Sequence, residues 1–166
     1  ISYIATTSGT YYLKANTYSY GTGTYTIKAS TIADDYSDLR NYATSLTLGT
    51  AKNGNIEVSG DVDYFKVDLV AGKKYLFEMN DVTLGTSGDA YLELYSGTTY
   101  NSFLASGHES NNKAQISYIA TTSGTYYLKA NTYYYSSTGK YTVKATAVAD
   151  DHSDTITGAT LLTPGI

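Results

Sequence analysis

The chain has 166 residues, 11 basic and 15 acidic side chains, a formal net charge of −4 and no cysteine. The missing cysteine excludes disulfide bonds, thiol catalysis and cysteine-ligated zinc sites, and the sparse, slightly acidic charge argues against nucleic acid as a partner. The 20 tyrosines, the single proline and many Thr and Gly residues favour strands joined by short turns.

No segment shows a helical period of useful length, so the sequence predicts an all-β fold. Strands are expected at 1–5, 9–16, 23–30, 44–48, 55–59, 63–69, 73–80, 90–96, 102–105, 114–120, 124–131, 140–146 and 155–163. Alternation within them, as in Phe65, Val67 and Leu69, is typical of half-buried antiparallel strands. About eight such strands per unit predict an antiparallel β-sandwich of jelly-roll type.

The chain repeats itself with a period of about 115 residues. Residues 1–18 recur at 116–133 with all 18 positions identical, and the acidic segment 33–38 recurs at 149–154 with one change. A period of this length corresponds to one domain per repeat. We therefore expect a tandem repeat in which 1–33 is the C-terminal part of one unit, 34–148 is complete, and 149–166 begins the next.

A series of short motifs runs through the complete unit: SGDVDYF at 59–65, LVAGKKY at 69–75, AYLELY at 90–95, ISYIA at 116–120 and SGTYYL at 123–128. In order and spacing this series resembles the bacterial pre-peptidase C-terminal (PPC) domain, here in tandem copies. The resemblance implies a small β-sandwich of exported bacterial proteins with non-catalytic roles in secretion, adhesion, substrate binding or calcium-linked stability. The chain departs from the family pattern in having no protease attached and in carrying near-identical copies.

Carboxylates gather at the predicted unit boundary and at the start of the strand at 63–69. Calcium binds six to eight oxygen ligands in a tolerant geometry, which a boundary segment folded onto this strand would supply. The resemblance also implies calcium where the N-terminal linker meets the body of the domain. The alternative is an ordinary polar junction, since Asp is common in turns. The predicted ligands are Asp34, Asp35, Asp38, Asp61 and Asp63, with Asp150, Asp151 and Asp154 in the next repeat.

The tyrosines divide between the two faces of the predicted strands. Those on the apolar faces should be core: Tyr3, Tyr11, Tyr25, Tyr75, Tyr118, Tyr126 and Tyr141. Outward tyrosines suit protein interfaces and stacking on sugars, although they also raise strand propensity without any partner. We expect an interface, chiefly with neighbouring copies, at Tyr12, Tyr64, Tyr91, Tyr95, Tyr127 and Tyr134.

Catalysis has little support, because the chain has two histidines and no catalytic or nucleotide-binding motif. No membrane-spanning run is visible. The sequence is interpreted as a structural, non-catalytic repeat module of an extracellular bacterial fibre or surface adhesin, with calcium at the unit junctions. Its expected partners are copies of itself, head to tail, in a covalent array or a strand-complemented polymer. The alternative is an accessory domain of a secreted hydrolase that binds carbohydrate or protein.

Overall fold

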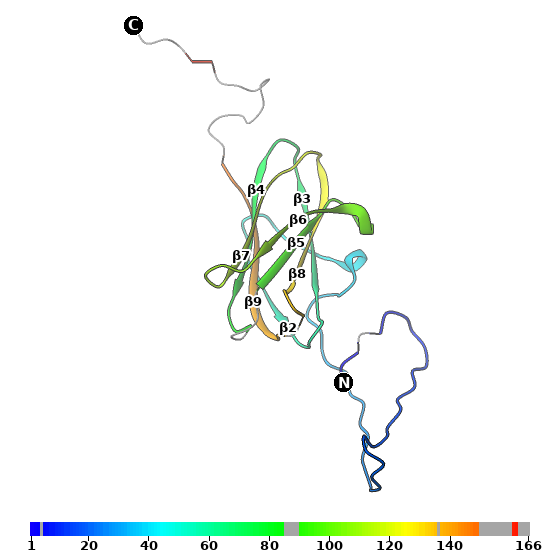
Figure 1. The fold of residues 1–166 in the computed structure, drawn as a ribbon. Coiled ribbons are helices and arrows are strands. Elements are labelled where there is room, and N and C mark those ends of the chain that lie inside the picture. Colours follow the sequence, from blue (N-terminus) through cyan, green and yellow to red (C-terminus); the bar gives the residue numbers. More distant parts are fainter. Residues whose placement is uncertain (4, 85–89, 136, 150–160, 163–166) are drawn as a thin grey trace. The chain divides into compact units, whose positions relative to one another are not determined.

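The computed structural model describes residues 1–3, 5–84, 90–135, 137–149 and 161–162. The chain forms two compact units, Ile1–Ala33 and Asp34–Ile166. The larger unit contains all the described strands (Figure 1): β1 Thr44–Ser45, β2 Lys52–Ile56, β3 Asp63–Leu69, β4 Lys74–Asp81, β5 Ala90–Tyr95, β6 Phe103–His108, β7 Lys113–Ile119, β8 Gly124–Thr132 and β9 Gly139–Ala147. A short 3-10 helix, η1 Arg40–Tyr42, precedes β1, and a second, η2 Tyr100–Ser102, lies between β5 and β6.

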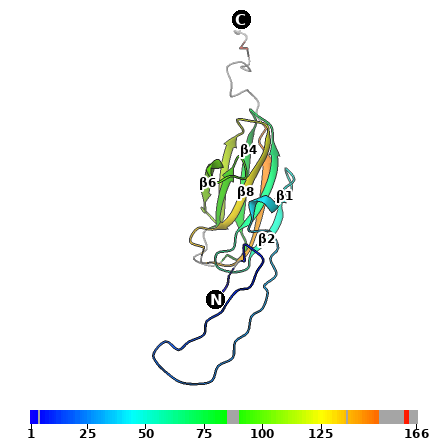
Figure 2. The same cartoon turned by 90° about the vertical axis from the view of Figure 1, so that its right-hand side faces the viewer.

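The strands of the larger unit form two layers (Figure 2). One sheet has five strands in the order β1-β3-β8-β5-β6, and the other has four in the order β2-β9-β4-β7. Only the two-residue β1 pairs in parallel, with β3, and the other ladders between described strands are antiparallel. The predicted all-β, antiparallel sandwich is therefore confirmed, while its jelly-roll type and its tandem repetition stay predictions.

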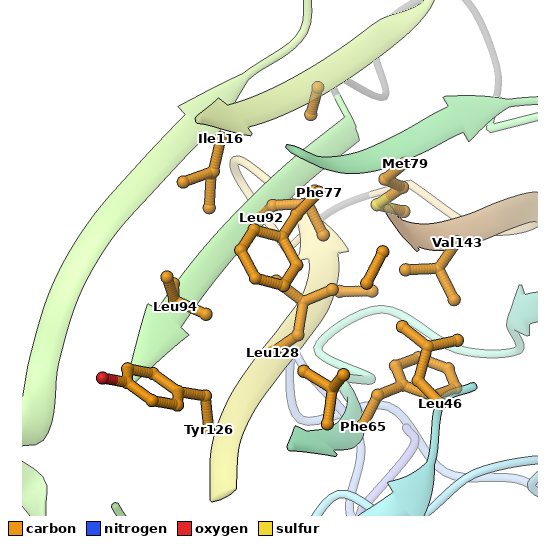
Figure 3. Packing of buried hydrophobic residues seen from close by; sticks show 14 of the residues in the cluster. Leu46, Phe65, Phe77, Met79, Leu92, Leu94, Ile116, Tyr126, Leu128 and Val143 are labelled. Atoms are coloured by element: carbon orange, nitrogen blue, oxygen red, sulfur yellow. The ribbon is translucent and has the colours of Figure 1, made fainter. Parts of the chain in front are cut away.

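The core lies between the two sheets and follows the alternation read from the sequence. Phe65 of β3 faces inward beside Leu128 of β8, and Phe77 and Met79 of β4 come from the opposite layer (Figure 3). Val67 of β3 is buried on the same face as Phe65. Tyr75, Tyr126 and Tyr141 are fully buried as predicted. Tyr118 is only half-buried and packs against the edge of the core.

The smaller unit differs from the prediction. Its described residues, 1–3 and 5–33, form no strand, so the strands expected at 1–5, 9–16 and 23–30 are wrong. The tyrosines expected in its core are exposed as well: Tyr3 by 71 %, Tyr11 by 50 % and Tyr25 by 72 %. The same 18-residue sequence forms β7 and β8 at 116–133, where it pairs with β4, β3 and β5. Because 1–33 contains no copy of those partner strands, strand propensity alone does not build a sheet there.

The chain enters and leaves the larger unit at opposite ends of its sheets. The linker segment 34–38 lies at the end where Tyr36 donates a hydrogen bond to the Asn53 carbonyl oxygen and Ser37 accepts one from the Tyr64 amide. At the other end, beyond β9, the amide of Val148 donates to the carbonyl oxygen of Lys74. We call these the linker end and the exit end (Figure 1). The strand expected at 155–163 lies outside the described residues except for 161–162, which form none.

Candidate metal centre

Three carboxylates meet at the linker end of the sandwich. Asp63 is the first residue of β3 and faces inward in the same row as Ala130, while Asp61 precedes it by two residues. Both are buried, with 0 % and 4 % of their surfaces exposed. Asp34 comes from the linker segment, and one carboxylate oxygen from each of the three lies within 4.8 Å of the others. The fold thus brings Asp34 together with Asp61 and Asp63, which come nearly 30 residues later in the sequence.

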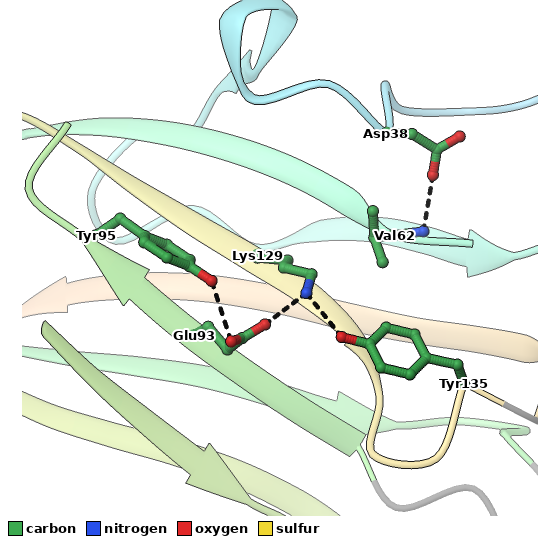
Figure 4. A network of polar contacts seen from close by, with 6 residues as sticks. All are labelled: Asp38, Val62, Glu93, Tyr95, Lys129 and Tyr135. Carbon is green, nitrogen blue, oxygen red and sulfur yellow. Dashed lines mark hydrogen bonds and ion pairs between the residues drawn. The ribbon is translucent and has the colours of Figure 1, made fainter. Parts of the chain in front are cut away.

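A second group of carboxylates overlaps the first. Oxygens of Asp34, Asp35 and Glu57 also lie within 4.8 Å of one another. Glu57 follows directly after β2 and was not among the predicted ligands. The available sequence signal was weak: an acidic residue that ends a strand and precedes Asp61 by four positions. Asp38 belongs to neither group; its Oδ1 accepts a hydrogen bond from the Val62 amide at 2.9 Å and so fastens the linker segment to the start of β3 (Figure 4).

The buried carboxylates are only partly satisfied by the protein. Asp63 Oδ2 accepts a short hydrogen bond from the Tyr141 hydroxyl, whereas its Oδ1 is buried and has no partner in the part of the chain that the structure describes. Asp61 Oδ2 accepts from the Glu57 amide at 2.9 Å, and Glu57 Oε2 is likewise buried and unpaired. Nearly all buried polar atoms in proteins have a partner. Two carboxylate oxygens of this cluster therefore lack a partner among the described residues, and a cation or a proton would satisfy them.

Burial and crowding also shift the pKa values of these carboxyl groups. Burial, with neighbouring carboxylates, raises the pKa of Asp63 to about 9 and that of Asp61 to about 8. Burial and the charge of Glu57 raise the pKa of Asp35 to about 6, and burial also raises the pKa of Asp34. Without a cation, this arrangement disfavours several adjacent negative charges. A bound cation would reverse that preference and allow all the carboxylates to ionise.

The donor set fits calcium among common cations. The two overlapping groups, Asp34 with Asp61 and Asp63, and Asp34 with Asp35 and Glu57, offer only carboxylate oxygens, which are hard donors. Ca²⁺ tolerates a crowded, irregular set of this kind, whereas Mg²⁺ requires near-octahedral geometry and retains its waters. The donors come from the linker segment, from Glu57 directly after β2 and from Asp61 and Asp63 at the start of β3, so an ion bound here would tie the linker to the sandwich. The corresponding aspartates of the next repeat, Asp150, Asp151 and Asp154, lie outside the described residues.

Several of the predicted interface tyrosines share one face of the larger unit, and Tyr12 is 94 % exposed in the smaller unit. Tyr64, Tyr91 and Tyr127 are half-buried on the outer face of the five-stranded sheet. Tyr134 follows β8 and is exposed.

Tyr95 was expected to be available on this face, but it is only 8 % exposed. The guanidinium of Arg40, from η1, lies 3.6 Å from its ring centroid and covers it. Beside it, Lys129 donates to Glu93 at 2.6 Å and to the Tyr135 hydroxyl at 3.0 Å (Figure 4). These contacts pair polar side chains with one another and cover a tyrosine that the alternation pattern had placed on the solvent-facing side of the sheet.

Comparison with known proteins assigns the fold. Residues 61–132 match the sequence model of the bacterial pre-peptidase C-terminal domain. The chain contains a PPC domain. A PPC domain is non-catalytic, serves as an accessory domain of peptidases, and belongs to secreted bacterial proteins. The match spans β3 to β8 and includes Asp61 and Asp63, while the linker aspartates precede it.

Two solved structures are similar to the chain, and the first shares its fold. The PPC domain of a collagenase from Bacillus anthracis has 17% sequence identity and a TM-score of 0.52, covering 70% of this chain and 99% of that one. A periplasmic inhibitor of g-type lysozyme from Aeromonas hydrophila, PliG, has 10% identity and a TM-score of 0.46, covering 62% and 95%. No curated protein matches the chain. In the described residues, no helix combines the length and apolar character needed to cross a membrane.

Proposed function

We propose that residues 34–148 form a non-catalytic accessory module of an exported bacterial protein, in which calcium fastens the N-terminal linker to the sandwich. The module adds binding or spacing to the protein that carries it and has no chemistry of its own. The observation that carries the proposal is the buried Asp63 carboxylate, which lies beside the linker aspartate Asp34 and has one oxygen unpaired among the described residues. A linker held by an ion has a defined direction relative to the module.

Calcium titration of the metal-free chain tests the proposal. Ca²⁺ should raise the melting temperature and protect the bonds at 33–38 from a nonspecific protease, because a ligand that binds only the native state stabilises it. Mg²⁺ at equal concentration should do much less. Asp63→Asn should remove both effects, whereas Asp68→Asn, an exposed position whose carboxylate contacts only Thr125, should retain them. Equal melting curves with calcium and with chelator would contradict the proposal.

The contact face of the module, we propose, is the outer face of the five-stranded sheet. The rings of Tyr91, His108 and Tyr133 lie together there, with centroids 4.4 to 5.4 Å apart. Clustered aromatic planes suit both protein contacts and sugar stacking. Retention on insoluble polysaccharides and on a denatured-protein matrix would separate the two classes. Tyr91→Ala should lower retention, and Tyr42→Ala, exposed on η1, is its control. A parent chain that neither matrix retains would exclude this face as the binding surface.

A second candidate function is that of a repeating unit in a fibre or adhesin. It is favoured by the 18 identical residues of 1–18 and 116–133, and by the separation of the linker end from the exit end, which lets modules follow one another without folding back. An antibody against 34–148 should then label isolated cell-surface polymers at regular intervals. A single label per protein would favour the accessory role alone.

A further inference from the structure

Cationic side chains gather on the outer face of the four-stranded sheet, on the opposite side of the sandwich from the aromatic contact face. The residues of β4, β7 and β9 that alternate with buried ones face away from the core. Lys113 of β7 pairs there with Glu78 of β4 at 3.0 Å. The charged members of this outward set are four lysines and one glutamate: Lys74, Lys113, Lys140, Lys144 and Glu78. The face is therefore positive, although the whole chain has a net charge of −4.

The outer face of the five-stranded sheet differs in charge and in residue type. There Lys66 and Lys129 are balanced by Asp68 and Glu93, and the remaining outward residues include the tyrosines described above. On the four-stranded sheet the outward strand residues include no aromatic ring, and the neutral ones are mostly Asn, Gln, Ser and Thr. A positive face rich in amides and hydroxyls suits a polar ligand of negative charge.

A hollow of about 380 Å³ opens at the linker end of this cationic face. Its polar lining comes from two paired strands, with Asn53 and Asn55 of β2 on one side and Lys140 and Thr142 of β9 on the other. Small-ligand sites have volumes of about 300–1,000 Å³, so the hollow is large enough for one compact unit. Amide and hydroxyl groups both donate and accept hydrogen bonds, as the hydroxyls of a sugar do.

We propose that the outer face of the four-stranded sheet binds an acidic saccharide chain. Carboxylate or sulfate groups of the chain pair with the lysines, and one sugar unit occupies the hollow. Lys140 and Lys144 lie four residues apart on β9, about 13 Å at ~3.3 Å per residue, so a chain contacts both where a single small anion does not. Nucleic acid is disfavoured, because the outward strand residues offer no aromatic side chain or arginine on which bases could stack.

Among the residues that line the hollow, Asp35 carries the charge that opposes an anion. It belongs to the candidate metal centre, where a bound cation would offset its charge. Binding of the saccharide does not require the ion. In chelator, Asp35 should weaken the binding, and Asp35→Asn should raise the affinity about 2- to 5-fold by removing the repulsion. A measurement in chelator therefore separates failure of this proposal from failure of the calcium proposal.

Fluorescence anisotropy of an end-labelled oligogalacturonate, in chelator and at low ionic strength, gives the test. The parent chain should bind, with an affinity that falls as salt is added. Lys140→Gln and Lys144→Gln should each lower the affinity about 2- to 5-fold, as expected for exposed ion pairs. Lys66→Gln makes the same change of total charge on the other sheet and should leave the affinity nearly unchanged. An equal loss in all three variants would assign the binding to total charge and overturn the proposal.

Other probes identify the class of ligand. Oligosaccharides of dextran sulfate compare sulfate with carboxylate groups, and neutral dextran oligosaccharides should not bind. Duplex DNA and polyphosphate, both without the sugar hydroxyls of a saccharide chain, should bind more weakly than the acidic saccharides. Asn55→Ala should lower the affinity for the saccharides several-fold through lost hydrogen bonds in the hollow. Tight binding of DNA or polyphosphate, with no effect of Asn55→Ala, would overturn the saccharide assignment, and a parent chain that binds no acidic saccharide would overturn the proposal.

Discussion

The hydroxyl of Tyr141, on β9 of one sheet, donates a short hydrogen bond to Oδ2 of Asp63, on β3 of the other. Both side chains are buried, so the bond crosses the interior of the sandwich at its linker end. It holds the Asp63 carboxylate in place and leaves Oδ1 for a partner that the described residues do not supply. Partners of this kind, one layer behind a metal ligand, orient the ligand and tune its affinity.

Tyr141→Phe should weaken calcium binding. The carboxylate of Asp63 would lose the one hydrogen bond that the described residues give it, and with it a fixed orientation. Loss of such a partner lowers metal affinity about 10- to 100-fold. Calorimetric titration with Ca²⁺ measures the change. Tyr75→Phe is the matched control, because its buried hydroxyl accepts from the Val70 amide away from the cluster. Both variants should lose about 1 kcal/mol of stability, but only Tyr141→Phe should change the affinity. Equal affinities would contradict the role of Tyr141.

Gly54→Ala should disturb the candidate metal site by displacing the Tyr141 ring. A Cβ at position 54, on β2, would lie 2.2 Å from Cζ of Tyr141. The ring fills the space above the glycine and cannot move without leaving Asp63. We expect a loss of stability of about 1–3 kcal/mol from overpacking, together with a weaker stabilisation by calcium. In Gly97→Ala the nearest atom is 3.8 Å away, so denaturant unfolding of that variant should match the parent.

The stability of the metal-free chain should fall as the pH rises from about 5 to about 8. Folded Asp61 and Asp63, with pKa values of about 8 and about 9, keep protons that the unfolded chain loses above the ordinary aspartate pKa of 3.8. The folded state then binds more protons than the unfolded state, so the free energy of unfolding decreases with pH. Melting curves in chelator should show this fall, and saturating Ca²⁺ should abolish it by replacing the protons. Asp63→Asn should flatten the profile; an unchanged slope in that variant would contradict the assignment.

Phe65→Ala and Tyr64→Ala test the register of β3. Phe65 is fully buried, and its removal should cost about 3–5 kcal/mol through lost burial and the cavity left behind. Tyr64 lies on the outer face, half-buried, with Arg40 5.3 Å from its ring centroid. Its loss should cost much less, and urea unfolding of the two variants gives the comparison. A reversed order would mean that β3 is displaced by one residue.

The sequence alone determined the all-β class, the positions of most strands between 44 and 147, and the inward face of β3 and β4. Alternation has a period of two, so a strand such as 63–69 records in its own residues which side is buried. The density of Asp at 34, 35, 61 and 63 was also visible in advance, since oxygen-rich clusters are a property of residue type. Turn geometry is local too: Tyr20 and its counterpart Tyr135 both adopt a positive φ of 53°.

Only the tertiary structure decided whether a strand-forming segment becomes a strand. Residues 1–18 and 116–133 have the same propensities, yet 124–132 forms β8 because β3 and β5 flank it, and 9–17 forms no strand in a unit without such neighbours. The same holds for the candidate site. Glu57 joined the carboxylates, Asp38 became a cap on Val62, and Tyr95 was buried under Arg40, all through contacts between residues distant in the chain. A strand's hydrogen bonds, and a carboxylate's neighbours, are supplied by other segments, so they cannot be read from the segment itself.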